Sequence, residues 1–130
     1  MATITIYDET ISGEKTDGFD LEFASATISA RELIRKRVYE EVREFNLREE
    51  ETFHGLVQPT DAERVLNGYK LKKKRQLDWE QQFERAIAAF ERNGFFILAD
   101  GKQIESLDET IELKLRTQAS FVKLVPLVGG

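Results

Sequence analysis

The chain has 130 residues, 41% hydrophobic and 33% charged, with a net charge of −5, one histidine and no cysteine. A chain of this size predicts one domain with a buried core, and its lack of cysteine excludes disulfides, thiolate metal sites and a cysteine nucleophile of its own. The acidic balance gives the chain as a whole no basic footprint for nucleic acid.

The sequence also lacks the signals of a membrane or exported protein. No apolar run approaches the ~20 residues that a membrane-spanning helix needs. The start, Met1–Ile4, lacks the basic and apolar regions of a signal peptide. We therefore expect a cytoplasmic protein that makes no membrane contact.

Two alternating segments near the start predict a β-hairpin. Residues 3–7 alternate apolar and polar side chains, which predicts a strand with Ile4 and Ile6 facing inward. Residues 19–23 alternate again, with Leu21 and Phe23 on the apolar face. The polar connection between the two segments contains turn-forming glycines.

A long helix is predicted next. Ser29–Glu32 has the pattern of a capping box, in which the serine hydroxyl accepts from the third helical N–H. The helix is expected to run to about Phe45, with Asn46 as its stop. Apolar side chains recur on one stripe of this helix, at Leu33, Ile34, Val38, Val42 and Phe45.

Residues 46–94 are predicted to be a helical insertion. Thr60–Glu63 forms a second capping box, which predicts a short helix ended by Asn67-Gly68. Asp78 is an acceptable N-cap for a second long helix, which Asn93-Gly94 ends with Gly94 as the left-handed cap. The apolar positions of that helix, expected to be core or cover, are Phe83, Ile87 and Phe90.

The last third of the chain reads as strands and turns. Phe95–Ala99 is a continuous apolar run, typical of a central strand. Asp100-Gly101 predicts a tight turn into a short return strand that begins at Gln103-Ile104. Thr110–Leu113 is a further short element, and Phe121–Leu127 is the predicted last strand, which runs toward Val128-Gly129-Gly130.

This order of elements, with a terminal Gly-Gly, resembles the ubiquitin-like β-grasp family, which includes ubiquitin and the sulfur carriers MoaD and ThiS. The segment Ile97–Glu105 is similar to ubiquitin's LIFAGKQLE, and the spacing from Lys102 to Gly130 is the same as in ubiquitin. The tail Leu124–Gly130 is more similar to that of MoaD. The resemblance covers residues 3–45 and 95–130 and leaves residues 46–94 unmatched.

The resemblance implies an α+β fold: a β-grasp mixed sheet with one crossover helix, plus the helical insertion between that helix and the third strand. It implies a single ubiquitin-like domain over residues 1–130, with residues 46–94 inserted and residues 126–130 as an extended tail.

Alternation in the last strand leaves open which of its two faces points toward the core. Because an unpaired lysine in a core is costly, we expect Val122 and Leu124 inward and Phe121, Lys123 and Val125 outward. Phe121 and Lys123 then form a candidate partner patch.

The resemblance also implies that the chain is a substrate and carrier for other enzymes. It would catalyse no reaction itself and bind no cofactor. An adenylating enzyme would use ATP to activate the Gly130 carboxylate, next to Gly129, for transfer as a thioester to target amines. A conjugating enzyme and a JAB-type or other peptidase are further expected partners, together with target proteins. Two alternatives stay open: a MoaD/ThiS-like sulfur carrier bearing a C-terminal thiocarboxylate, and a non-covalent interaction module.

The tail departs from ubiquitin, because Pro126 and Val128 stand where ubiquitin has arginines. A dedicated activating enzyme of the MoeB/ThiF type, or a relative of the ubiquitin-activating enzymes, is therefore expected. It would recognise Val125, Pro126, Leu127 and Val128. Lys102 occupies the place of a ubiquitin lysine that accepts further ubiquitin and is a candidate acceptor.

The remaining charged and aromatic residues are expected to have surface or packing roles rather than catalytic or ligand-binding ones. His54 is expected on the surface, and the acidic run Glu49–Glu51 is expected to be solvated rather than a metal site. The basic run Lys70–Arg75 is short and lies in an acidic protein, so a salt-bridged or partner-facing strip is favoured over nucleic-acid binding. Trp79 is expected to be a packing anchor.

Overall fold

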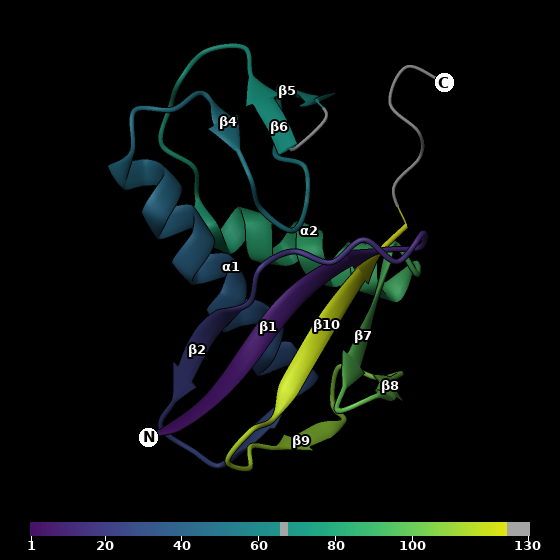
Figure 1. Cartoon of the computed structure of the whole chain (residues 1–130). Coiled ribbons are helices and arrows are strands. Elements are labelled where there is room, and N and C mark those ends of the chain that lie inside the picture. Colours follow the sequence, from purple (N-terminus) through teal and green to yellow (C-terminus); the bar gives the residue numbers. More distant parts are fainter. Residues whose placement is uncertain (66–67, 125–130) are drawn as a thin grey trace. The chain divides into compact units, whose positions relative to one another are not determined.

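The computed structural model describes residues 1–65 and 68–124, which form an α+β structure with a mixed sheet and two helices (Figure 1). These residues fall into two compact units. The sheet unit contains residues 1–33 and 90–124, and the second unit contains residues 34–65 and 68–89.

The sheet unit is built on five strands: β1 (Ala2–Thr10), β2 (Phe19–Phe23), β7 (Phe95–Ala99), β8 (Lys102–Ile104) and β10 (Gln118–Lys123). Their order is β2-β1-β10-β7-β8, with β10 in the centre (Figure 1). β1 and β10 run parallel, whereas the other neighbouring pairs are antiparallel. Parallel neighbours need a long connection, and the chain between β1 and β10 contains both helices.

The predicted N-terminal hairpin is confirmed. β1 pairs with β2 in the register Ile4↔Leu21, and Ile4, Ile6 and Leu21 are all buried. The predicted Asp100-Gly101 turn is confirmed as well, since Asp100 has φ 48° and Gly101 has φ 82°. Two consecutive left-handed residues match the twist of a two-residue hairpin, here between β7 and β8.

A second, shorter pairing holds the start of the first helix in the sheet unit. β3 (Thr27–Ser29) pairs antiparallel with β9 (Thr110–Glu112). The next two amides, those of Ala30 and Arg31, donate to the carbonyls of Glu109 and Leu107 at 3.0 Å each. The first turn of the helix is thereby fixed to the segment before β9.

Helix α1 (Ala30–Leu47) begins as the capping pattern predicts. The Ser29 hydroxyl accepts a hydrogen bond from the Glu32 N–H at 3.1 Å, which satisfies one of the free amides of the first turn. The predicted stripe is confirmed, because its five apolar side chains are all buried: Leu33, Ile34, Val38, Val42 and Phe45.

The predicted stop at Asn46 is wrong, because Asn46 lies inside the last turn of α1. Its side-chain amide instead binds the backbone of Leu77, accepting from the N–H at 2.8 Å and donating to the carbonyl at 3.0 Å. Lys74 donates to the Phe45 carbonyl at 3.0 Å and lies 3.4 Å from the centre of the Phe45 ring. The open carbonyls at the helix end are therefore satisfied by a segment thirty residues away.

Replacing Asn46 by alanine should lower the free energy of unfolding by about 1–3 kcal/mol, because two backbone groups of the buried Leu77 lose their partner. Chemical denaturation followed by far-UV circular dichroism measures this change. The matched control is Leu47→Ala at the next position, which is 77% exposed and should change stability by less than about 0.5 kcal/mol. Equal effects of the two substitutions would contradict the assigned role of Asn46.

The second unit contains a small antiparallel sheet where a helix was predicted. Its strands are β4 (Thr52–Phe53), β5 (Ala62–Val65) and β6 (Gly68–Leu71), in the order β4-β6-β5. The short helix expected after Thr60–Glu63 is therefore wrong. Asp61 has φ 53°, which suits a turn rather than a helix start. Val65 pairs directly with Gly68, so β5 and β6 form a hairpin in place of the predicted helix. Asn67 itself lies outside the described residues.

Helix α2 (Trp79–Glu91) starts as predicted, with the Asp78 carboxylate accepting from the Glu80 N–H at 3.0 Å. Its left-handed cap is Asn93, with φ 62°, and not Gly94 as predicted. The buried side chains of the helix also differ from the expected set. Gln82, Ala86, Ala89 and Phe90 are buried, whereas Phe83 and Ile87 are half-exposed.

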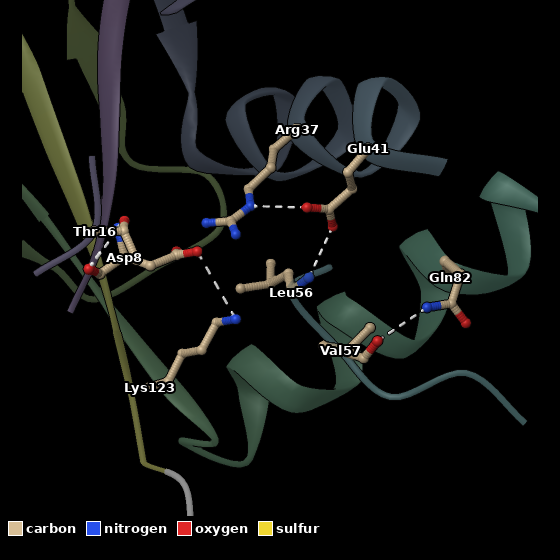
Figure 2. A network of polar contacts seen from close by, with 8 residues as sticks. All are labelled: Asp8, Thr16, Arg37, Glu41, Leu56, Val57, Gln82 and Lys123. Atoms are coloured by element: carbon tan, nitrogen blue, oxygen red, sulfur yellow. Dashed lines mark hydrogen bonds and ion pairs between the residues drawn. The ribbon is translucent and has the colours of Figure 1, made fainter. Parts of the chain in front are cut away.

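Polar side chains from both helices hold the buried segment that follows β4 (Figure 2). Glu41 accepts from the Leu56 N–H at 2.9 Å and is paired with Arg37 at 3.3 Å. Gln82 donates to the Val57 carbonyl at 3.1 Å. A buried loop needs such partners because it has no strand neighbours for its backbone groups.

Candidate functional site

The predicted activation site follows the central strand of the sheet unit. Lys123, the last residue of β10, pairs with Thr10 of β1 and Phe95 of β7. The next amide, that of Leu124, donates to the Gly94 carbonyl at 3.3 Å. The chain is therefore held on both sides up to Lys123, and on the side of β7 at Leu124. The predicted activation and recognition residues lie outside the described residues: Val125, Pro126, Leu127, Val128, Gly129 and Gly130.

The face assigned to Phe121 from the sequence is wrong. Phe121 is fully buried, and its ring lies 5.8 Å from that of Phe95. Ala119, two residues earlier, is buried on the same face. Phe121 is consequently part of the core of the sheet unit, and the predicted partner patch of Phe121 and Lys123 is not an exposed apolar surface.

Lys123 shares the inward face with Phe121 because side chains alternate along a strand. Its ammonium group pairs with the Asp8 carboxylate at 3.9 Å, and the two side chains are 23% and 20% exposed (Figure 2). The assumption that an inward lysine would lack a partner was therefore wrong. A sequence signal existed, since continuing the alternation of Ile4 and Ile6 puts Asp8 on the inward face.

The outward face of the same strands carries an apolar surface that the sequence analysis missed. Val122 pairs with Phe96, and Ser120 pairs with Leu98. Tyr7 on β1 lies opposite Ser120. These side chains are half-exposed. Treating residues 95–99 as a strand buried on both faces concealed this surface, which continues along β10 to the last described residues.

Lys102 is exposed, as an acceptor lysine must be. Its side chain is 81% exposed at the start of β8, and its ammonium group lies 3.9 Å from the Glu109 carboxylate. An ion pair this exposed contributes little to stability, so the amine is accessible to a reaction partner.

A cleft of about 560 Å³ opens in the sheet unit between the start of α1, the end of α2 and the region around β8. Its lining includes Phe90, Phe95, Gln103 and the Arg31–Asp108 ion pair at 3.7 Å. Among the described residues that line it, no serine or lysine is paired with a base as nucleophilic catalysis requires.

The charged runs lie where solvent reaches them. His54 and Glu49–Glu51 are exposed, and no cluster of three or more potential metal ligands occurs among residues 1–65 and 68–124. In the basic run, Lys70, Lys72 and Lys73 are exposed, whereas Lys74 caps α1 and Arg75 donates to the Thr60 carbonyl. In the described part of the chain no helix is long and apolar enough to cross a membrane.

Comparison with protein-family models, with curated proteins and with solved structures found no significant match.

Proposed function

We propose that this chain is a ubiquitin-like protein modifier, with a β-grasp fold in its sheet unit and a Gly130 carboxylate that is joined to target amines. One observation carries the proposal. The last described strand, β10, lies parallel to β1 and between β1 and β7, and the sequence continues from it directly to Gly129-Gly130. A β-grasp modifier requires this order, in which a hairpin and helix come first and the final strand lies beside the first.

The proposed chemistry takes place at the carboxylate. A Gly130 oxygen attacks the α-phosphorus of ATP on a partner enzyme, and pyrophosphate leaves. A partner thiolate then displaces AMP to form a thioester, and a target amine displaces the thiol to form an isopeptide bond. Glycine suits each step because it has no Cβ to obstruct the approach of the nucleophile. This chain has no cysteine, so each thiol that takes part in these reaction steps belongs to a partner.

The described part of the chain supports this role by fixing the base of the tail. Strand pairing and the Asp8–Lys123 ion pair hold β10 at its end. Six residues follow Leu124 in the sequence, and six residues span at most about 20 Å. The outward apolar surface around Val122 is then within reach of any enzyme that binds the tail. The proposed partners are an adenylating enzyme of the MoeB/ThiF or ubiquitin-activating type, a conjugating enzyme and a JAB-type or other peptidase.

The test is a tryptic digest of a tagged full-length chain expressed in its native cells. Lys123 is the last basic residue, so trypsin should leave residues 124–130 as a branch on the modified lysine. Mass spectrometry should therefore find peptides whose lysines carry Leu-Val-Pro-Leu-Val-Gly-Gly. A variant without Gly129 and Gly130 should lose every adduct, because its carboxylate no longer follows two glycines.

The Lys102→Arg variant serves as the matched control, since it should lose only those adducts in which the chain modifies itself. Undiminished adducts from the deletion variant would rule the modifier out. An intact mass raised by one oxygen-to-sulfur exchange, without adducts, would identify the sulfur carrier. The tail's likeness to MoaD favours that second function, whereas the second unit provides more surface than a minimal carrier needs.

A further inference from the structure

The second unit carries a cluster of aromatic side chains that solvent reaches. Tyr39 on α1 is 41% exposed, and its ring meets that of Trp79 on α2 edge-on at 5.4 Å. Phe83, one turn further along α2, lies 6.5 Å from Trp79, and both rings are half-exposed. The Arg35 guanidinium lies over the Trp79 ring at 4.9 Å. We call these four residues the aromatic patch. Trp, Tyr and Arg are enriched among the residues that dominate binding energy at protein interfaces, and Phe is enriched in interface composition.

Arg35 differs from the other basic residues of α1. Arg31, Lys36, Arg37 and Arg43 each have a carboxylate within 4.0 Å. No carboxylate of the described residues is ion-paired with Arg35. The Arg35 side chain is exposed, and its guanidinium lies over the Trp79 ring. A guanidinium has five N–H donors, and a cation–π contact with one ring does not use them all, so Arg35 can still bind an incoming carboxylate.

The α2 side of the aromatic patch carries the complementary charge. Glu80 and Glu84 directly follow Trp79 and Phe83 on α2, and a step of one residue places them about 100° further around the helix, away from the buried Gln82 and Ala86. Both are exposed, and neither is ion-paired in residues 1–65 and 68–124. The aromatic patch therefore has a basic rim on α1, an apolar centre, and an acidic rim on α2.

This arrangement is complementary to itself. In a two-fold symmetric interface the same surface meets its own copy. A two-fold axis that runs between the helices brings the basic rim of one copy to the acidic rim of the other and stacks the aromatic centres. We propose that the chain forms a symmetric dimer through the aromatic patch, with Arg35 of each copy paired with Glu80 or Glu84 of the other. This interface is independent of the proposed activation at Gly130.

A centre of three rings is small for an interface, so the dimer should be weak, with a dissociation constant in the micromolar range. Sedimentation equilibrium over micromolar to millimolar protein concentrations should show reversible dimerisation. Trp79 is the only tryptophan, so its fluorescence reports on the aromatic patch alone. Its emission should shift to shorter wavelength over the same concentration range.

Charge reversal provides the decisive test. Arg35→Glu should raise the dissociation constant at least ~10-fold, because like charges then face each other across the interface. The triple variant Arg35→Glu/Glu80→Arg/Glu84→Arg should restore dimerisation, since both copies then carry the exchanged charges. Arg48→Glu is the matched control: it changes the net charge equally at another exposed arginine and should leave the constant nearly unchanged. Far-UV circular dichroism verifies that each variant is folded.

Three results would each overturn the dimer: a monomer at every concentration, equal effects of Arg35→Glu and Arg48→Glu, or a triple variant that associates no better than Arg35→Glu. Trp79→Ala gives a further check. Loss of a central aromatic anchor should weaken the dimer by ~30-fold, and an unchanged constant would show that the contact lies elsewhere.

Discussion

Replacing Phe121 by alanine is expected to lower the free energy of unfolding by about 3–5 kcal/mol, the largest loss of stability among the substitutions considered. Phe121 is fully buried in the central strand, against the ring of Phe95. Truncation removes the buried apolar area and leaves a cavity that neighbouring strands cannot fill, because pairing on both sides fixes β10. Denaturant unfolding followed by far-UV circular dichroism measures the loss.

The neighbouring residue supplies the control for this prediction. Val122 lies on the outward face and is half-exposed, so Val122→Ala should cost no more than about 1 kcal/mol. Phe121→Leu keeps most of the volume and should cost less than about 2 kcal/mol, which preserves a measurable protein if the alanine variant does not fold. Similar losses for Phe121→Ala and Val122→Ala would contradict the assignment of Phe121 to the buried face and Val122 to the outward face.

Replacing Gly55 by alanine is expected to destabilise the protein by about 1–3 kcal/mol, although it adds only one methyl group. A Cβ at this position would lie 2.0 Å from the Phe53 ring. The ring cannot turn away easily, because Phe53 is 1% exposed and meets the Phe45 ring edge-on at 5.4 Å. The same unfolding measurement applies.

A double-mutant cycle distinguishes this clash from a general effect of alanine in a loop. In a Phe53→Leu background the ring is absent, so adding Gly55→Ala should cost much less than it does in the native chain. If alanine costs the same in both backgrounds, contact with the Phe53 ring is not the cause.

Local patterns predicted most of the sheet unit. Alternation located β1 and β2 and the inward side chains Ile4 and Ile6, and the Asp-Gly pair located the β7–β8 turn. These signals succeed because a turn type or a strand facing is set by a few consecutive residues. The capping serine of α1 was found for the same reason.

Local patterns gave wrong predictions where the structure of one segment depends on a distant partner segment. The pattern at Thr60–Glu63 fits a helix start, and only its pairing with β6 shows that the residues after it form a strand. The facing of Lys123 depended on Asp8, which lies more than a hundred residues earlier and is brought close by the parallel register of β1 and β10. Of the candidate site, the sequence identified the strand leading to the tail but not the apolar face beside it.

By itself, then, the sequence determined the α+β class, the capped long helices, the turns and the strand that leads to Gly129-Gly130. Tertiary structure alone decided which face of β10 is buried, that β5 and β6 pair with each other, and that Arg35, Tyr39 and Trp79 meet on one surface. The physical reason is the range of the interactions. Caps, turns and alternation act within a few residues, whereas burial and ion pairing depend on partners that only the folded chain brings together.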